Sequence, residues 1–144
     1  MILYWLTAFP TLGDLALLIL RLVIGLMFAM SGYFKLTDPE RKGKMADSLK
    51  SAGVSPALTP LFSAGELLGG LGVTFGLLTA LSALGLLAIT VGALLTVSGP
   101  QTEGEGIHKL ENLLYSPEML LAAGLVVLLA TGAGGWSLDR LVFA

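Results

Sequence analysis

Three long blocks of apolar residues constrain this chain more than any other feature of its sequence. They run from Leu15 to about Lys35, from about Leu58 to Val97 and from about Pro117 to Ala133. At ~1.5 Å per residue the first block can cross the ~30 Å hydrocarbon core of a bilayer once, and the second is about twice that length. The second block is therefore expected to turn back near Gly76 to Ala80. The predicted transmembrane helices lie at about 15–35, 58–77, 80–98 and 117–134.

The composition fits a chain that lies in lipid. Apolar residues make up 55% of its 144 residues and charged residues only 12%, about half of the ~25% usual in soluble domains. A soluble domain of this size cannot hide so much apolar surface. The sequence thus predicts one domain over 1–144, an all-α integral membrane bundle of four transmembrane helices.

Two polar segments separate the apolar blocks. In the segment from Thr37 to Pro56, the spacing of Met45, Leu49 and Ala52 favours a short amphipathic helix at the membrane interface, and a solvated connector is the alternative. The segment from Ser98 to Tyr115 contains several glycines and one proline. It is expected to begin irregularly and to form a helical turn near His108 to Leu114.

Several function classes are excluded or disfavoured by composition. The chain has no cysteine, which excludes disulfides, thiolate metal sites and a thiol relay. A single histidine, His108, does not predict a metal site, since such sites recruit several ligands. The net charge of −2 without a long basic run disfavours a nucleic-acid partner. The first 14 residues lack a basic region, so Tyr4, Trp5 and Phe9 are interpreted as interfacial anchors rather than parts of a signal peptide.

Basic residues predict the orientation of the chain. With four spans, both polar segments lie on one face of the membrane, the loop face, and both termini lie on the other, the terminal face. The terminal face carries Arg140, whereas the loop face carries Lys35, Arg41, Lys42, Lys44, Lys50 and Lys109. The positive-inside rule then predicts a multi-pass protein of the cell membrane with cytoplasmic loops and external termini.

Charges inside the apolar blocks are expensive to bury, and they are therefore the first candidates for a site. Arg21 and Glu66 are the internal charges of the first and second blocks. An Arg21–Glu66 ion pair inside the bundle is the simplest way to avoid two isolated charges in lipid. The pair either fixes helix register only or forms a polar site for a lipid headgroup, a quinone carbonyl or a proton, and spacing does not decide between these readings.

Further polar residues gather toward the loop face. Gly25, Phe28, Gly32 and Lys35 follow Arg21 at helical spacing, so one stripe of the first helix carries both cations. Together with Ser31, Tyr33, Glu66 and Glu118, Lys35 is predicted to line a cavity that opens toward the loop face. The alternatives are interfacial snorkelling for Lys35 and capping of the last helix for Glu118.

A glycine stripe on the second helix, Gly65, Gly69, Gly72 and Gly76, favours close packing against another helix. The partner helix lies either within the bundle or in a second protomer, so a homo-oligomer through this helix is one expectation.

Ordered motifs resemble those of the DoxX family of membrane proteins. Arg21 to Gly25 and Ser31 to Pro39 resemble the family's first-helix signature, and Gly65 to Gly70 followed by Gly76 to Thr79 resembles its second. Trp136 to Arg140 resembles the common ending. The resemblance spans nearly the whole chain and implies a four-helix membrane bundle, with Arg21, Lys35 and Glu66 as recurring polar positions.

What the resemblance implies about function is an accessory or quinone-interacting membrane subunit of an oxidoreductase. The ligand-binding residues would be Arg21, Tyr33, Lys35, Glu66 and Glu118, with the bilayer around them. No covalently bound cofactor is expected, so redox centres would come from soluble partner subunits. The alternative is a non-enzymatic lipid or small-molecule binder, or an assembly factor for other membrane proteins. A transporter is disfavoured, because four spans offer few polar residues for a pathway.

Overall fold

The computed structural model describes residues 10–143, and helices are the only regular elements within that range. The proposed anchors Tyr4, Trp5 and Phe9 lie outside it. The all-α fold expected from the sequence is confirmed. The elements are α2 (Pro10–Thr37), α3 (Pro39–Ser51), the 3-10 turn η1 (Pro56–Leu58), α4 (Thr59–Phe75), α5 (Thr79–Ala93), the π-helical segment η2 (Leu94–Ser98), α6 (Gly99–Gln101), α7 (Ile107–Leu114), α8 (Pro117–Thr131) and α9 (Leu138–Phe143).

Three glycines let α2 and α4 pack backbone against backbone in antiparallel directions. A Cβ added at Gly25 would lie 2.6 Å from the Thr74 nitrogen, and one at Gly32 would lie 2.4 Å from the Leu67 nitrogen. A Cβ added at Gly70 would lie 2.3 Å from the backbone nitrogen of Ala29 in α2. No side chain fits at these points, so the glycines fix the register of the two helices.

Three glycines of the stripe, Gly65, Gly69 and Gly72, face α5 within the same chain, and the fourth, Gly76, follows the end of α4. A Cβ added at Gly69 would lie 2.9 Å from the Leu86 side chain, and one at Gly72 would lie 2.3 Å from the Ser82 hydroxyl. Gly65 lies farther away, with Ile89 at 3.6 Å. The intramolecular reading of the stripe is therefore correct, and a homo-oligomer remains a prediction.

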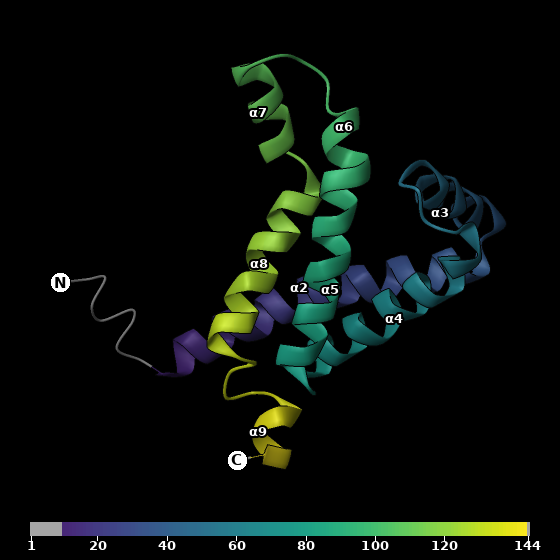
Figure 1. Cartoon of the computed structure of the whole chain (residues 1–144). Helices are drawn as coiled ribbons and strands as arrows, with labels where there is room; N and C mark the ends of the chain where they lie inside the picture. Colours follow the sequence, from purple (N-terminus) through teal and green to yellow (C-terminus); the bar gives the residue numbers. More distant parts are fainter. Residues whose placement is uncertain (1–9, 144) are drawn as a thin grey trace.

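Two helix pairs cross to build the core. α2 lies beside α4, α5 lies beside α8, and the second pair crosses the first (Figure 1). The side chains buried at the crossing come from all four helices, namely Ile24, Phe28, Val73, Ala83, Leu86, Leu125 and Leu128. The stripe of α2 that begins at Arg21 is the face turned toward α4, as its spacing predicts.

The turn between α4 and α5 lies where the sequence predicts it. Gly76 ends α4 in a left-handed conformation (φ 68°), which costs glycine little. Leu78 also has a positive φ, 50°, and directly precedes α5. A left-handed leucine is unfavourable by itself, and contacts from the C-terminal segment described below hold it there.

The two polar segments at the loop face form the helices that the sequence predicts there. α3 is the amphipathic helix predicted in the first polar segment. Asp38 caps it by accepting a hydrogen bond from the Glu40 N–H. The predicted helical turn in the second segment is α7, whose first residue, Ile107, is 74% exposed and is followed after its end by Tyr115, which is 78% exposed. Where the sequence predicts the third helix to end near 98, helical structure continues to Gln101 through η2.

Within residues 10–143, three helical stretches are long and apolar enough to cross a membrane: Leu12–Thr37, Pro56–Phe75 and Thr79–Thr96. A fourth span exists if α7 and α8, which meet at a 61° bend, are counted as one. The 15 residues of α8 alone give ~22 Å, which is shorter than a ~30 Å core. The protein is thus an all-α membrane protein with three or four candidate spans.

Candidate functional site

Lys35 and Glu66 form a partly buried ion pair between α2 and α4, near the loop face. The Lys35 Nζ lies 2.9 Å from Oε1 and 3.0 Å from Oε2 of Glu66. The Ser31 hydroxyl donates to Oε2 at 3.1 Å. Glu66 is 4% exposed, so its charge depends on these two partners. Lys35 points inward to this carboxylate, so the snorkelling interpretation of Lys35 is wrong.

The expected Arg21–Glu66 pair is not formed, and helix register is the reason. The Gly25 contact places Arg21 beside the last turn of α4, whereas Glu66 directly precedes Leu67, the residue that Gly32 contacts. Fourteen positions, 35 minus 21, separate Lys35 from Arg21, or ~21 Å along a helix. Glycine contacts of this kind fix how far one helix is shifted along the other. The limits of the apolar blocks in the sequence leave that shift uncertain by several residues.

Arg21 instead joins the C-terminal segment to α4 at the terminal face. It is 1% exposed. One Nη donates to the carbonyl of Trp136, and the other donates to the carbonyl of Thr74 at 3.4 Å. The Thr74 carbonyl belongs to the last turn of α4, where carbonyls lack intrahelical partners and attract cations. Gly76 has no side chain because a Cβ there would lie 2.3 Å from Arg21 Nη1.

Two aspartates complete a terminal clasp with Arg21. Asp14 accepts a hydrogen bond from the Gly135 N–H at 2.8 Å. Asp139 accepts from the N–H groups of Leu78 and, at 2.9 Å, Thr79, and thereby caps α5. Burial alone would raise the pKa of Asp139, but these hydrogen bonds and the Arg21 charge together hold that pKa below its usual value. Neither aspartate is among the site residues that the sequence predicts.

Two small cavities flank the Lys35–Glu66 pair, and both residues line each of them. The apolar cavity, about 210 Å³, is closed on one side by α3 through Met45, Leu49 and Ala52. The polar cavity, about 150 Å³, is also lined by Ser31, Thr90 and Glu118. The two cavities give the ion pair room for a ligand on either side, inside largely apolar walls.

Glu118 and Tyr33 differ in their relation to this site. Glu118 opens α8 next to Pro117, as expected, and lines the polar cavity. Tyr33 was expected to line a cavity but is 52% exposed, with its ring edge against Phe34. Two positions along a helix correspond to a rotation of ~200°, so Tyr33 points away from the face that carries Ser31 and Lys35.

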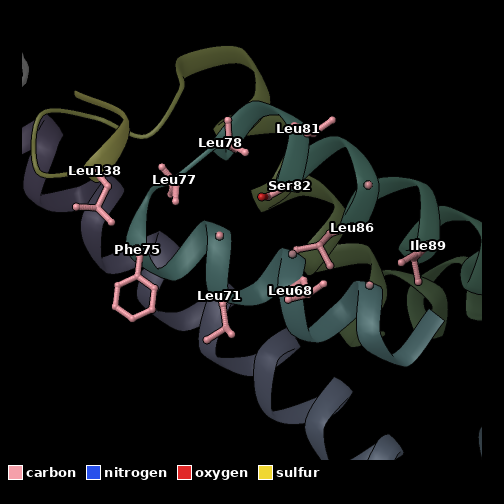
Figure 2. Close-up of a pocket in the computed structure, with 14 residues that line it drawn as sticks. Leu68, Leu71, Phe75, Leu77, Leu78, Leu81, Ser82, Leu86, Ile89 and Leu138 are labelled. Atoms are coloured by element: carbon pink, nitrogen blue, oxygen red, sulfur yellow. The ribbon is translucent and has the colours of Figure 1, made fainter. Parts of the chain in front are cut away.

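A larger concavity, which we call the leucine groove, lies elsewhere. It measures about 610 Å³, runs between α4 and α5, and is covered at one end by Leu138 (Figure 2). Its lining is leucine, isoleucine, phenylalanine and glycine, and Ser82 is the one polar side chain among the lining residues. Without charged or acidic groups it can hold an apolar chain but supplies no chemistry, so the candidate reactive site is the Lys35–Glu66 pair.

Comparisons with known proteins agree with this architecture. Inner membrane protein YqjF of Escherichia coli is 27% identical over 131 residues, which cover 91% of this chain and 95% of that protein. An uncharacterized membrane protein of Mycobacterium tuberculosis, Rv3486, is 28% identical over 133 residues, which cover 89% and 82%. No solved structure matches. The DoxX family model matches residues 16–99, more than half of the sequence, and the chain therefore belongs to the DoxX family of membrane proteins.

Proposed function

We propose that the chain is a quinone-interacting membrane subunit of an oxidoreductase and binds the quinone head at the Lys35–Glu66 pair. The observation that supports this is an ion pair between a buried Glu66 and a partly exposed Lys35, with a cavity on each side of it. Ionisable groups at membrane depth are expensive and commonly mark ligand or proton sites. Lys35 takes the place that the sequence analysis gave to Arg21.

The chemistry of the pair suits a carbonyl head. A lysine ammonium carries three N–H donors, so Lys35 can donate to a quinone oxygen while it keeps its contact with Glu66. Each cavity is smaller than the ~300 Å³ at the low end of drug-sized pockets, which fits a ring but not a prenyl tail. The tail then lies in the surrounding lipid.

Reduction of the quinone takes up two electrons and two protons to give the quinol. In the proposed complex, the electrons come from a reduced cofactor of a soluble partner subunit, and the protons come from water at the loop face. Glu66 is the carboxylate placed to pass those protons to the quinone oxygens, and Lys35 stabilises the negative charge that develops on them.

The test is mass spectrometry of the lipophilic molecules that co-purify with the protein in a mild detergent. We expect a quinone near one per chain, and its loss in Glu66→Gln and in Gly92→Phe. Gly92 lines the apolar cavity, and an added Cβ there meets nothing within 4 Å, so we expect a phenylalanine ring to be accepted there and to occupy the cavity. The matched control is Gly85→Phe, equally open but in the leucine groove. Bulk lipid alone, unchanged by these substitutions, would contradict the proposal and favour a non-enzymatic binding or assembly role.

We also propose that the loop face is cytoplasmic, because it carries most of the basic residues. The chain has no cysteine, so single cysteines at Lys44 and Thr102 report on accessibility without background. Both should resist an impermeant thiol reagent in intact cells and react after permeabilisation. Labelling of both in intact cells would reverse the orientation.

A further inference from the structure

Arg21 has more hydrogen-bond donors than partners. Its two hydrogen bonds go to carbonyls, and its Nε is buried without a partner. A guanidinium carries five N–H donors and a full positive charge, while a carbonyl carries only a partial negative charge. Among residues 10–143, no carboxylate forms an ion pair with Arg21 within 4.0 Å.

The nearby aspartates compensate Arg21 only at longer range. Asp139 contributes an electrostatic interaction with Arg21, but both of its oxygens accept backbone N–H groups at the start of α5. Asp14 likewise accepts from Gly135. Each aspartate thus has donors of its own, and Arg21 keeps unused donors in a site almost without solvent.

Arg21 lines an open groove of about 470 Å³, the arginine groove, at the terminal face. Trp136 and Leu18 form its walls, with Thr74 beside Arg21. Phe75 and Leu138, both labelled in Figure 2, line this groove as well as the leucine groove, so the two grooves adjoin there. A buried cation therefore lies close to the place where the two grooves meet.

We propose that the two grooves together bind an acidic amphiphile, with its oxyanion head at Arg21 and its alkyl chain in the leucine groove. The planar guanidinium matches a carboxylate or phosphate, to which it can donate two parallel hydrogen bonds. From Leu78 to Ile89 the leucine groove follows eleven residue steps of α5, or ~16 Å, which accommodates most of an acyl chain. Arg21 lies ~21 Å along α2 from Lys35, and Ile89, at the far end of the leucine groove, also lines the cavities beside the Lys35–Glu66 pair.

Trp136 provides a direct reporter, because it lines the arginine groove and only one other tryptophan, Trp5, is present. In the Trp5→Phe protein, purified in a non-ionic detergent, Trp136 fluorescence is titrated with dibromostearic acid and with a phosphatidic acid carrying the same brominated chains. Dibromostearyl alcohol and inorganic phosphate are the matched probes without a charge and without a chain. Saturable quenching by either acid, at least about tenfold tighter than by the alcohol, is expected from a charge-assisted pair. The stronger of the two acids identifies the head as carboxylate or phosphate.

Four substitutions locate the ligand. Arg21→Lys keeps the positive charge but not the planar group that donates two parallel hydrogen bonds, and it should weaken binding of the acid about tenfold. Gly85→Phe should abolish binding by filling the leucine groove. Arg140→Gln removes an exposed charge from the same face and should leave binding unchanged, as should Gly92→Phe at the other site. Gly85→Phe leaves Arg21 and its partners intact, so it remains informative if changes at Arg21 disturb folding.

Equal binding of acid and alcohol, or full binding by both Arg21→Lys and Gly85→Phe, would overturn the proposal. Displacement of the acid by millimolar inorganic phosphate would also overturn it, because it would show an anion site that needs no chain. If the unsubstituted protein carries no quinone but still binds the acid, only the proposed function is refuted.

Discussion

The two ends of the α2–α4 pair use buried charge in different ways. At the loop face, Lys35 and Glu66 neutralise each other directly and have a cavity on each side. At the terminal face, Arg21, Asp14 and Asp139 make their hydrogen bonds with backbone groups, and these bonds join segments far apart in the sequence. The same helix pair thus carries a side-chain pair at one end and a chain-joining clasp at the other.

The difference shows that an intramembrane charge is best interpreted from what its partner does. A side-chain pair can open to admit a ligand, because both partners can find new hydrogen bonds there. A charge bound to backbone carbonyls and N–H groups holds those segments in place, and it can add a ligand only through donors that remain unused, as at Arg21.

The largest effect is expected from breaking the loop-face pair. Glu66→Leu or Lys35→Leu alone strands a buried charge and should lower the free energy of unfolding by about 3–5 kcal/mol, whereas the double substitution should lose much less than the sum. Equilibrium unfolding in mixed detergent micelles measures all four proteins of the cycle.

A second cycle on Arg21 and Glu66 is the control. These residues share no partner, so their effects should add to within about 0.5 kcal/mol. Strong coupling between Arg21 and Glu66, or additivity between Lys35 and Glu66, would contradict the observed pairing.

The glycine contacts that separate the two ends should be the next most sensitive. Gly25→Ala places a Cβ 2.6 Å from the Thr74 nitrogen, so α2 and α4 must move apart at a cost of about 1–3 kcal/mol. Gly85→Ala is the matched control, because its Cβ meets nothing within 4 Å and alanine favours a helix. Thermal unfolding of both variants in one detergent gives the comparison, and equal midpoints would argue against backbone contact at Gly25.

Breaking the terminal clasp at Asp139 is expected to lower the free energy of unfolding by a smaller amount, and this loss should depend on pH. Asp139→Asn should cost about 1 kcal/mol at neutral pH, as for the loss of a helix cap. Because folding lowers the pKa of Asp139, its stabilising contribution is full above the ordinary value of ~3.9 and disappears as the pH falls through the lower folded-state pKa. The unfolding midpoints of the two proteins should therefore begin to approach each other below about pH 4 and coincide once the pH is below the folded-state pKa; a constant difference over that range would rule out this role for Asp139.

Hydropathy was sufficient to predict the helices but not their pairing. Long apolar blocks and the Gly76 region located α2, α4, α5 and the turn between them, because burial in lipid constrains length strongly. To predict the partner of Glu66, the axial register of α2 and α4 must be known. That register depends on contacts at Gly25 and Gly32 between positions distant in the sequence.

The terminal clasp could not be predicted from the sequence for a related reason. Asp14 and Asp139 lie outside the predicted spans and resemble ordinary solvated residues, and their targets are backbone N–H groups that no side-chain pattern reveals. The Trp136 to Arg140 motif was visible as a resemblance, but only the fold shows that it reaches the α4–α5 turn.

The most direct test compares Gly92→Phe with Gly85→Phe in a single extraction, with quinone and fatty acid quantified from the same purified sample by mass spectrometry. We expect a crossed result, with quinone lost only in Gly92→Phe and acidic amphiphile lost only in Gly85→Phe. Quinone retained in Gly92→Phe, or lost equally in both variants, would contradict a ligand site at the Lys35–Glu66 pair.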